Sequence, residues 1–128
     1  MVSGTSLTFY GGVNEIGGNK ILLEDKDTRI FLDFGKSFSR RAKFFEEYIN
    51  PRTSNGIVDF ITMGLVPDIP CIYRSDLMKL AGRKIETPSI DAVLLSHAHS
   101  DHADYISFLP SSIPRVLLFL ILNNNEMV

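Results

Sequence analysis

The chain has 128 residues, of which 45% are hydrophobic and 22% are charged, and its formal net charge is −2. This size and balance indicate at most one ordinary globular domain, and the small net charge excludes a global attraction to nucleic acid or to an anionic membrane. The single cysteine, Cys71, excludes an intrachain disulfide and a cysteine-rich zinc module.

Neither end of the chain indicates export or membrane insertion. Met1 to Ser6 contains no charged segment followed by an apolar one, so we expect no secretory signal and a cytoplasmic location. Val116 to Leu122 is wholly apolar, but it is far shorter than the roughly 20 residues that span a bilayer. We therefore expect a buried strand there, and no membrane partner.

Three short runs of β-favouring residues open the chain: Leu7 to Tyr10, Lys20 to Glu24 and Arg29 to Phe34. The polar residues 25–28 separate the second run from the third and predict a hairpin turn. The sequence therefore predicts an antiparallel meander at the start of the domain.

The middle of the chain predicts helices and irregular segments. Apolar residues recur at steps of three and four from Phe38 to Ile49, which predicts a short amphipathic helix closed by Pro51. Residues 52–75 are expected to be irregular because two prolines interrupt them. A second helical turn is expected over Asp76 to Leu80, with Ser75 or Asp76 as its N-cap.

The C-terminal part predicts a βαβ progression. Ile90 to Leu95 is an almost unbroken apolar run, the pattern of a strand buried on both faces of a sheet. Tyr105 to Leu109 predicts the start of a helix, residues 110–114 a loop, and Val116 to Leu122 the next strand.

All three histidines lie within six residues, at positions 97, 99 and 102. His97 and His99 are two apart, so in an extended segment their side chains point the same way and can share one metal ion. Asp101 and His102 follow after a turn and can face a second ion. Zinc and manganese accept imidazole nitrogen together with carboxylate oxygen, so these side chains suit either metal. The alternative, a solvated charged loop without a metal, would not explain why the histidines are clustered. The position just after a buried strand is also where open α/β folds place their chemistry.

The run His97-x-His99-x-Asp101-His102 resembles the HxHxDH motif of the metallo-β-lactamase superfamily. The resemblance implies an α/β (α+β) fold, namely the N-terminal half of a metallo-β-lactamase-like αβ/βα sandwich. It also implies two divalent metal ions, zinc or else manganese: His97 and His99 help to hold one, and Asp101 and His102 the other. Asp101 is then the catalytic residue that orients the nucleophile.

Two further segments resemble the same superfamily. Ile30 to Gly35 is similar to its early strand ending in Asp-x-Gly, which implies that Asp33 orients the metal ligands from outside; otherwise Asp33 is simply an acidic residue at a strand end. Gly11 to Asn19 is similar to the opening of ribonuclease J and the β-CASP nucleases. A phosphate-binding glycine loop is the alternative, but such a loop leads into a helix, whereas Lys20 to Leu23 predicts a strand. We expect a tight turn beneath the metal site.

The resemblance covers about residues 7–116, and residues 117–128 form a divergent tail of a single domain spanning 1–128. Asp104 stands where relatives place a glycine, so a further carboxylate is expected beside the second metal. No histidine follows His102, and no aspartate follows Asp104, although the family supplies later ligands. We therefore expect a truncated domain with weak metal binding, unless a homo-oligomer or a complementing second half completes the site.

Three functions remain open. The first is a metal-dependent hydrolase of the phosphodiesterase or ribonuclease type, with RNA as a candidate substrate. The second is a thioesterase or lactonase of the glyoxalase II kind. The third is a non-catalytic remnant or the partner subunit of a split enzyme. Contact with a nucleic-acid backbone would fall to a weak basic cluster, which consists of Lys36, Arg40, Arg41, Lys43 and Arg52.

Overall fold

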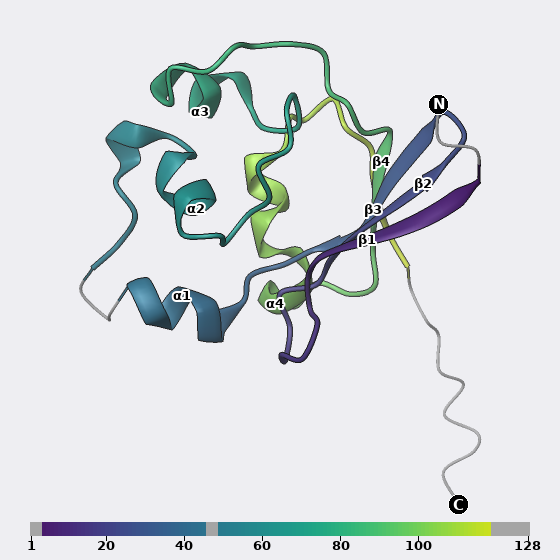
Figure 1. The fold of residues 1–128 in the computed structure, drawn as a ribbon, viewed down its shortest axis with the longest axis horizontal. Coiled ribbons are helices and arrows are strands. Elements are labelled where there is room, and N and C mark those ends of the chain that lie inside the picture. The colour runs from purple at the N-terminus through teal and green to yellow at the C-terminus, as the bar shows by residue number, and fades with distance from the viewer. Residues whose placement is uncertain (1–3, 46–48, 119–128) are drawn as a thin grey trace, which may run out of the picture.

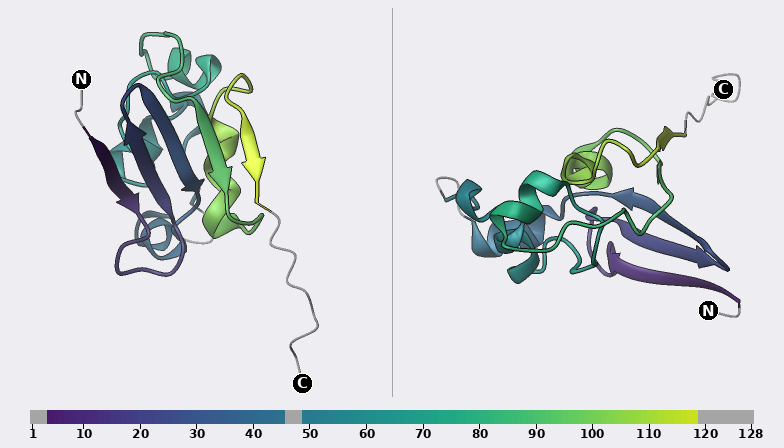
Figure 2. Two further views of the ribbon diagram at one scale, coloured as in Figure 1. Left: turned by 90° about the vertical axis from the view of Figure 1, so that its right-hand side faces the viewer. Right: turned by 90° about the horizontal axis from the view of Figure 1, so that it is seen from above.

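The computed structural model of the chain describes residues 4–45 and 49–118. The fold is α+β: a five-stranded mixed sheet, with short helices packed against one of its faces (Figure 1). The strands follow one another across the sheet in chain order, from β1 at one edge to β5 at the other (Figure 2, left). No helix among the described residues is long and apolar enough to cross a membrane.

The predicted antiparallel meander is confirmed. Strands β1 (Thr5–Gly11), β2 (Lys20–Asp25) and β3 (Thr28–Phe34) pair antiparallel in sequence. A two-residue turn joins β2 to β3, and its first residue, Lys26, has a positive φ of 53°. Alternation along β2 and β3 places Leu22 and Phe31 against the helices, because successive side chains point to opposite faces.

The predicted βαβ progression is confirmed as well. Strand β4 (Ala92–Leu95) lies parallel to β3, and β5 (Arg115–Leu117) lies parallel to β4. Helix α4 (Ser100–Ala103) and a following 3-10 helix, η2 (Asp104–Phe108), connect β4 to β5. Because β3, β4 and β5 are parallel, their carboxyl ends meet at one edge of the sheet, where the histidines follow β4.

The connection from β3 to β4 carries the remaining helices. Helix α1 (Phe38–Phe44) begins at Ser37, whose buried hydroxyl accepts a hydrogen bond from the Arg40 amide. The prediction of a helix reaching Ile49 is wrong, because Phe45 adopts an extended conformation and is buried, and Ile49 lies in no helix. Residues 46–48 lie outside the described part.

The prediction that residues 52–75 are irregular is wrong in part. They contain a short 3-10 helix (Thr53–Asn55) and helix α2 (Val58–Thr62). Helix α2 lacks a side-chain cap and contains three β-branched residues that disfavour helix, so packing on the core outweighs local propensity. Helix α3 (Ser75–Leu80) lies where it is predicted, but Arg74 is its N-cap and makes no side-chain capping bond.

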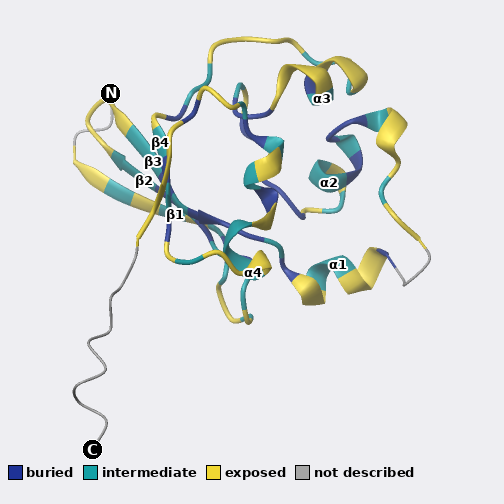
Figure 3. Cartoon of the chain, turned by 180° about the vertical axis from the view of Figure 1, so that it is seen from behind, coloured by how far each residue is buried: buried dark blue, intermediate teal, exposed yellow. Residues whose placement is uncertain are grey.

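The core lies between the helices and one face of the sheet (Figure 3). Phe31 and Val93 are fully buried there, and Phe31 contacts Phe34 edge to face with ring centroids 4.9 Å apart. The prediction that the strand before the histidines is buried on both faces is wrong. In β4, Val93 and Leu95 are buried, but Ala92 and Leu94 are only half-buried. No described helix covers the second face.

The last predicted strand also differs from the structure. Strand β5 is shorter than the predicted Val116 to Leu122, and its three residues are all exposed rather than buried. Residues 119–122 of the predicted strand lie outside the described residues. β5 pairs with β4 on one side and is an edge strand of the sheet, so fewer neighbours are available to cover it.

Candidate metal centre

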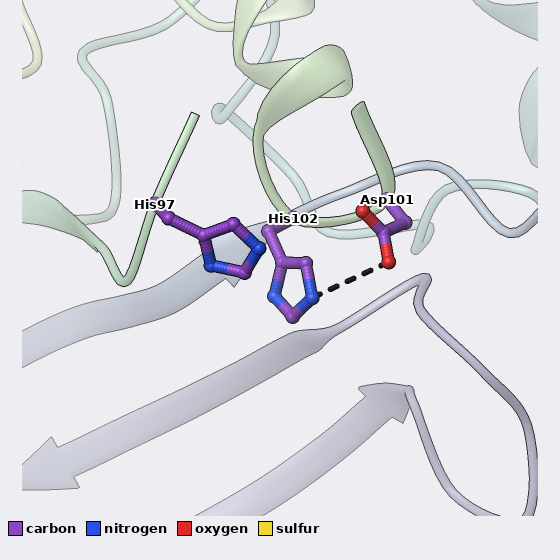
Figure 4. A group of neighbouring side chains, drawn as sticks. All are labelled: His97, Asp101 and His102. Carbon is purple, nitrogen blue, oxygen red and sulfur yellow. Dashed lines mark ion pairs between the residues drawn. The ribbon is translucent and has the colours of Figure 1, made fainter. Parts of the chain in front are cut away.

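Three of the four predicted ligands meet at the carboxyl end of β4. One donor atom each from His97, Asp101 and His102 lies within 4.8 Å of the other two, and all three residues are half-buried (Figure 4). His102 Nε2 lies 3.4 Å from Asp101 Oδ2. Two ligands of a tetrahedral zinc ion lie about 3.3 Å apart, so small side-chain shifts bring this group to the spacing of one ion.

His99 is the predicted ligand outside this group. It precedes α4 as its N-cap residue in an extended conformation, and it is exposed. Its ring still lies near that of His97, with centroids 4.8 Å apart, whereas the His97 and His102 rings are 4.0 Å apart. His97 is thus close to both other histidines. The arrangement favours one ion shared by His97, Asp101 and His102, rather than the predicted division into two pairs.

Asp33 reaches the histidines because β3 contains a bulge. The pairing of β2 with β3 shifts by one residue around Asp33, which has a positive φ of 59° and is 7% exposed. Aspartate tolerates this left-handed conformation better than most residues, and a bulge redirects the side chain at which it occurs. The carboxylate accepts hydrogen bonds from the amide and hydroxyl of Ser96, at 2.7 and 2.8 Å.

The same carboxylate orients His102. Asp33 Oδ2 lies 2.8 Å from His102 Nδ1, so an N–H at Nδ1 donates a hydrogen bond to the carboxylate. That leaves Nε2, which faces Asp101, as the nitrogen with a lone pair for a metal ion. A carboxylate behind a ligating histidine is the usual arrangement in metal sites, because it holds both the tautomer and the ring orientation.

The glycine-rich segment, Gly11 to Asn19, lies directly against the loop from His97 to His102 that carries the predicted ligands (the ligand loop), as the sequence predicts. The Gly18 amide donates to the Asp101 carbonyl at 2.8 Å, and the Gly35 amide donates to the Asn19 carbonyl at 3.0 Å. A Cβ at Gly17 would lie 2.4 Å from Asp101 Cβ, and one at Gly35 would lie 1.8 Å from the Asp101 carbonyl oxygen. Glycine is therefore required at both positions for the backbone to approach Asp101 this closely.

Glu15, within the glycine-rich segment, forms polar contacts with neighbouring residues. Burial raises the pKa of Glu15, but hydrogen bonds from the Gly12 amide and the Ser37 hydroxyl, together with the charge of Arg40, bring the net pKa below its usual value. Glu15 thereby fastens the glycine-rich segment to the start of α1.

Lys20 is buried beneath the same segment. It is 3% exposed, and Nζ donates to the Gly18 carbonyl at 3.2 Å. Burial lowers the pKa of Lys20 to about 8, against a partly opposing effect of Glu15. Nζ also lies 5.5 Å from the ring centroid of Tyr105, and burial raises the pKa of that tyrosine to about 12.

The basic residues near α1 are mostly paired with acidic ones. Lys36 Nζ lies 2.7 Å from Asp104, and Arg40 lies 3.3 Å from Glu15. Arg52 contacts Asp59 at 2.8 Å. These pairs reduce the positive charge that the cluster can offer to a nucleic-acid backbone. Asp104, expected as an extra carboxylate beside a metal, is paired with Lys36 and lies outside the three-donor group.

Two residues near the centre have no prediction from the sequence. Asn19 Nδ2 lies 3.3 Å from His102 Nδ1, and Ser96 Oγ lies 3.0 Å from His97 Nδ1. Ser96 thereby links Asp33 to the ring of His97. Asn19 belongs to the segment that resembles the β-CASP nucleases, which is the one signal that could have marked it.

Comparison with known proteins found similarity to solved structures. No protein-family model matches the chain, and no curated protein matches it. The chain is similar to a protein of unknown function from Enterococcus faecalis V583, known from a crystal structure, with 32% sequence identity and a TM-score of 0.63. The match covers 88% of this chain and 25% of that one, so this chain spans about a quarter of the length of that protein. The likeness supports the fold of the sheet and its helices.

Proposed function

We propose that this chain is the metal-binding part of a metallo-β-lactamase-fold hydrolase that cleaves phosphodiester bonds, with RNA as its candidate substrate. The observation that carries the proposal is the group formed by His97, Asp101 and His102, with the Asp33 carboxylate behind His102. This donor set matches zinc or manganese, and the carboxylate behind it is what a metal-binding histidine needs.

Each residue of the centre has a defined task in this proposal. His97, Asp101 and His102 hold one divalent ion, and His99 is available to a second ion once further ligands are supplied. Ions bound here would lower the pKa of a water molecule and offset the charge on phosphoryl oxygens. Asp33 holds the His102 ring so that Nε2 faces Asp101. Asp101 orients the nucleophile beside the ion.

The glycine-rich segment favours a nuclease over a thioesterase of the glyoxalase II kind. The part that resembles the β-CASP nucleases, Gly11 to Asn19, contacts two site residues: Gly18 bonds to the Asp101 backbone and Asn19 approaches His102. The segment therefore shapes the centre itself rather than a remote turn.

A second candidate function is the metal-binding subunit of a split enzyme. Its support is that His97, Asp101 and His102 form the only group of three or more such donors among the described residues. A catalytic zinc usually has three protein ligands, so this group suffices for one ion and leaves a second ion incomplete. A homo-oligomer or a complementing chain would then supply the remaining ligands.

Zinc titration of single variants tests the centre. We expect wild-type chain to bind one zinc ion, and His97→Ala and His102→Ala to weaken binding by at least about 100-fold. His99→Ala is the matched control, because it removes a histidine of the same loop outside the three-donor group, and we expect a loss below about tenfold. Isothermal titration with metal analysis measures both affinity and stoichiometry. Equal losses in all three variants would contradict the grouping.

Single-turnover assays then separate the functions. We expect slow, chelator-sensitive cleavage of a single-stranded RNA oligonucleotide in zinc or manganese, which Asp101→Asn abolishes. Hydrolysis of a thioester but not of RNA would instead support the glyoxalase II kind. Metal binding with no hydrolysis of either substrate would support the subunit of a split enzyme.

A further inference from the structure

The sheet has one face without helices. Viewed from above, all helices lie on one side of the strands (Figure 2, right), and the other view looks onto the uncovered face (Figure 2, left). The strand register shows which side chains share it: Leu7 pairs with Leu23, and Leu23 pairs with Ile30. Directly paired residues lie on the same side of a sheet, so these three form one row across β1, β2 and β3.

Ile30 also pairs with Ala92, which extends this row to β4. A second row on the same face crosses all five strands: Phe9 pairs with Ile21, Ile21 with Leu32, Leu32 with Leu94, and Leu94 with Val116. The uncovered face therefore presents nine apolar side chains from all five strands, namely Leu7, Phe9, Ile21, Leu23, Ile30, Leu32, Ala92, Leu94 and Val116. None of these nine residues belongs to the hydrophobic core or packs against it.

This face is more exposed at its edges than at its centre. Leu7 and Phe9 on β1 are 52% and 55% exposed, and Val116 on β5 is 46% exposed, whereas the residues between them are half-buried by their neighbours. The exposed area of the nine residues is on the order of 500 Å², as large as the biggest apolar patch of a typical monomer. Such a patch usually marks an interaction surface.

We propose that a second copy of this chain covers the uncovered face, sheet against sheet. Two such faces would bury on the order of 1,000 Å² in total, which is the lower bound for a specific interface. Apolar sheet faces pack together about 10 Å apart with interdigitating side chains, and a two-fold axis brings the same patch of both copies together.

The charge pattern supports a second copy over a charged partner. Among the described strand residues that the register places on this face, Asp25 is the one charged residue; it lies at the border of the nine-residue set and accepts a hydrogen bond from Thr5 at 2.8 Å. Two identical faces therefore meet without like-charge repulsion, whereas a nucleic acid or an acidic peptide would find no countercharge there. The proposal does not depend on the metal centre, whose ligands follow β4 at the end of the sheet.

Sedimentation equilibrium tests the proposal. We expect wild-type chain to form a dimer at micromolar concentration, and Leu7→Lys/Phe9→Lys to weaken dimerisation by at least about tenfold. Val116→Lys tests the opposite edge of the same face if the double variant fails to fold. Leu80→Lys is the matched control, since this leucine is 54% exposed but lies on α3. We expect it to dimerise like wild type.

The alternatives give different results. A wild-type chain that stays monomeric up to millimolar concentration would overturn the proposal. Association that persists in both face variants would also overturn it, because it would then run through another surface, such as the edge of β5. The affinity of the first zinc ion, whose ligands His97, Asp101 and His102 all belong to one chain, should not change in the same variants.

Discussion

Two regions of this molecule hold their shape in different ways. At the candidate metal centre, which we call the metal end, three segments meet: the glycine-rich segment, the residues after β3 and the start of α4. Backbone hydrogen bonds join them, including those from Gly18 to Asp101 and from Lys36 to Ser100. In the crossover from residue 52 to residue 91, exposed ion pairs such as Arg83 with Asp68 bridge the surface, and Gly82 faces open space. An added Cβ at Gly17 or Gly35 would clash with Asp101, whereas one at Gly64 or Gly82 would meet nothing within 4 Å. Gly56 is the crossover glycine that is packed as tightly, against the Leu77 carbonyl. Substitution should therefore cost more at Gly17 and Gly35 than at Gly64 and Gly82.

The two buried aspartates show the same contrast. Asp33 and Asp59 are each 7% exposed, and each accepts a hydrogen bond from a backbone amide. Asp59 bonds to Arg52, which is seven residues away, so it stabilises a local turn. Asp33 bonds to Ser96 and His102, more than sixty residues away, so it joins two strands at the candidate metal centre.

The largest effect is expected from Gly35→Ala. Its new Cβ would lie 1.8 Å from the carbonyl oxygen of Asp101 and 2.6 Å from the Cα of His102, so the ligand loop must move. We expect a loss of at least about 3 kcal/mol in the free energy of unfolding, together with loss of zinc binding. Urea denaturation and zinc titration measure the two effects.

Gly82→Ala is the control in the crossover. Gly82 has a positive φ of 65° but nothing within 4 Å of an added Cβ. The variant should lose only the conformational cost of about 1–2 kcal/mol and should keep its zinc affinity. Similar losses in both variants would show that Gly35 is no more tightly packed than the open turn at Gly82.

The next largest effect is the pH dependence of stability that the buried amine of Lys20 causes. Because burial lowers its pKa in the folded chain from 10.5 to about 8, the unfolded chain binds more protons between these values. Stability should therefore rise with pH through this window, by about 3 kcal/mol in total, while below about pH 8 the penalty is constant. Lys20→Met should remove this rise. Urea denaturation of both proteins between about pH 7 and about pH 9.5 gives the difference, and parallel curves would contradict a buried, protonated Lys20.

The smallest expected effect is on zinc affinity, which should differ between variants of Asp33 and Asp59. Asp33→Asn removes the charge behind His102, so zinc affinity should fall by about 10–100-fold. Asp59→Asn should lower stability by weakening the contact with Arg52 and leave zinc affinity unchanged. If both variants bind zinc like wild type, Asp33 has only a structural role.

The meander and the parallel strands were predictable because their signals are local. Apolar and β-branched runs separated by polar turns suffice to place β1, β2 and β3. Helix α2 was missed for the opposite reason, since its sequence disfavours a helix and only the surrounding core stabilises it. The end of α1 was missed because Phe45 leaves the helix to become buried, which periodicity alone does not reveal.

At the candidate metal centre, too, some features were predictable from local sequence and others depended on the tertiary structure. The sequence by itself determined that His97, Asp101 and His102 follow a strand and carry metal-binding atoms, because their spacing is short and needs no distant contact. The resemblance implied that Asp33 and the glycine-rich turn lie near the ligands, but only the tertiary structure decided that Asp33 meets His102, that the Gly18 amide bonds to the Asp101 carbonyl, and that one face of the sheet is left uncovered. These relations join residues far apart in the chain through a bulge, close backbone contacts and strand register, and no local pattern specifies which distant partner each residue meets.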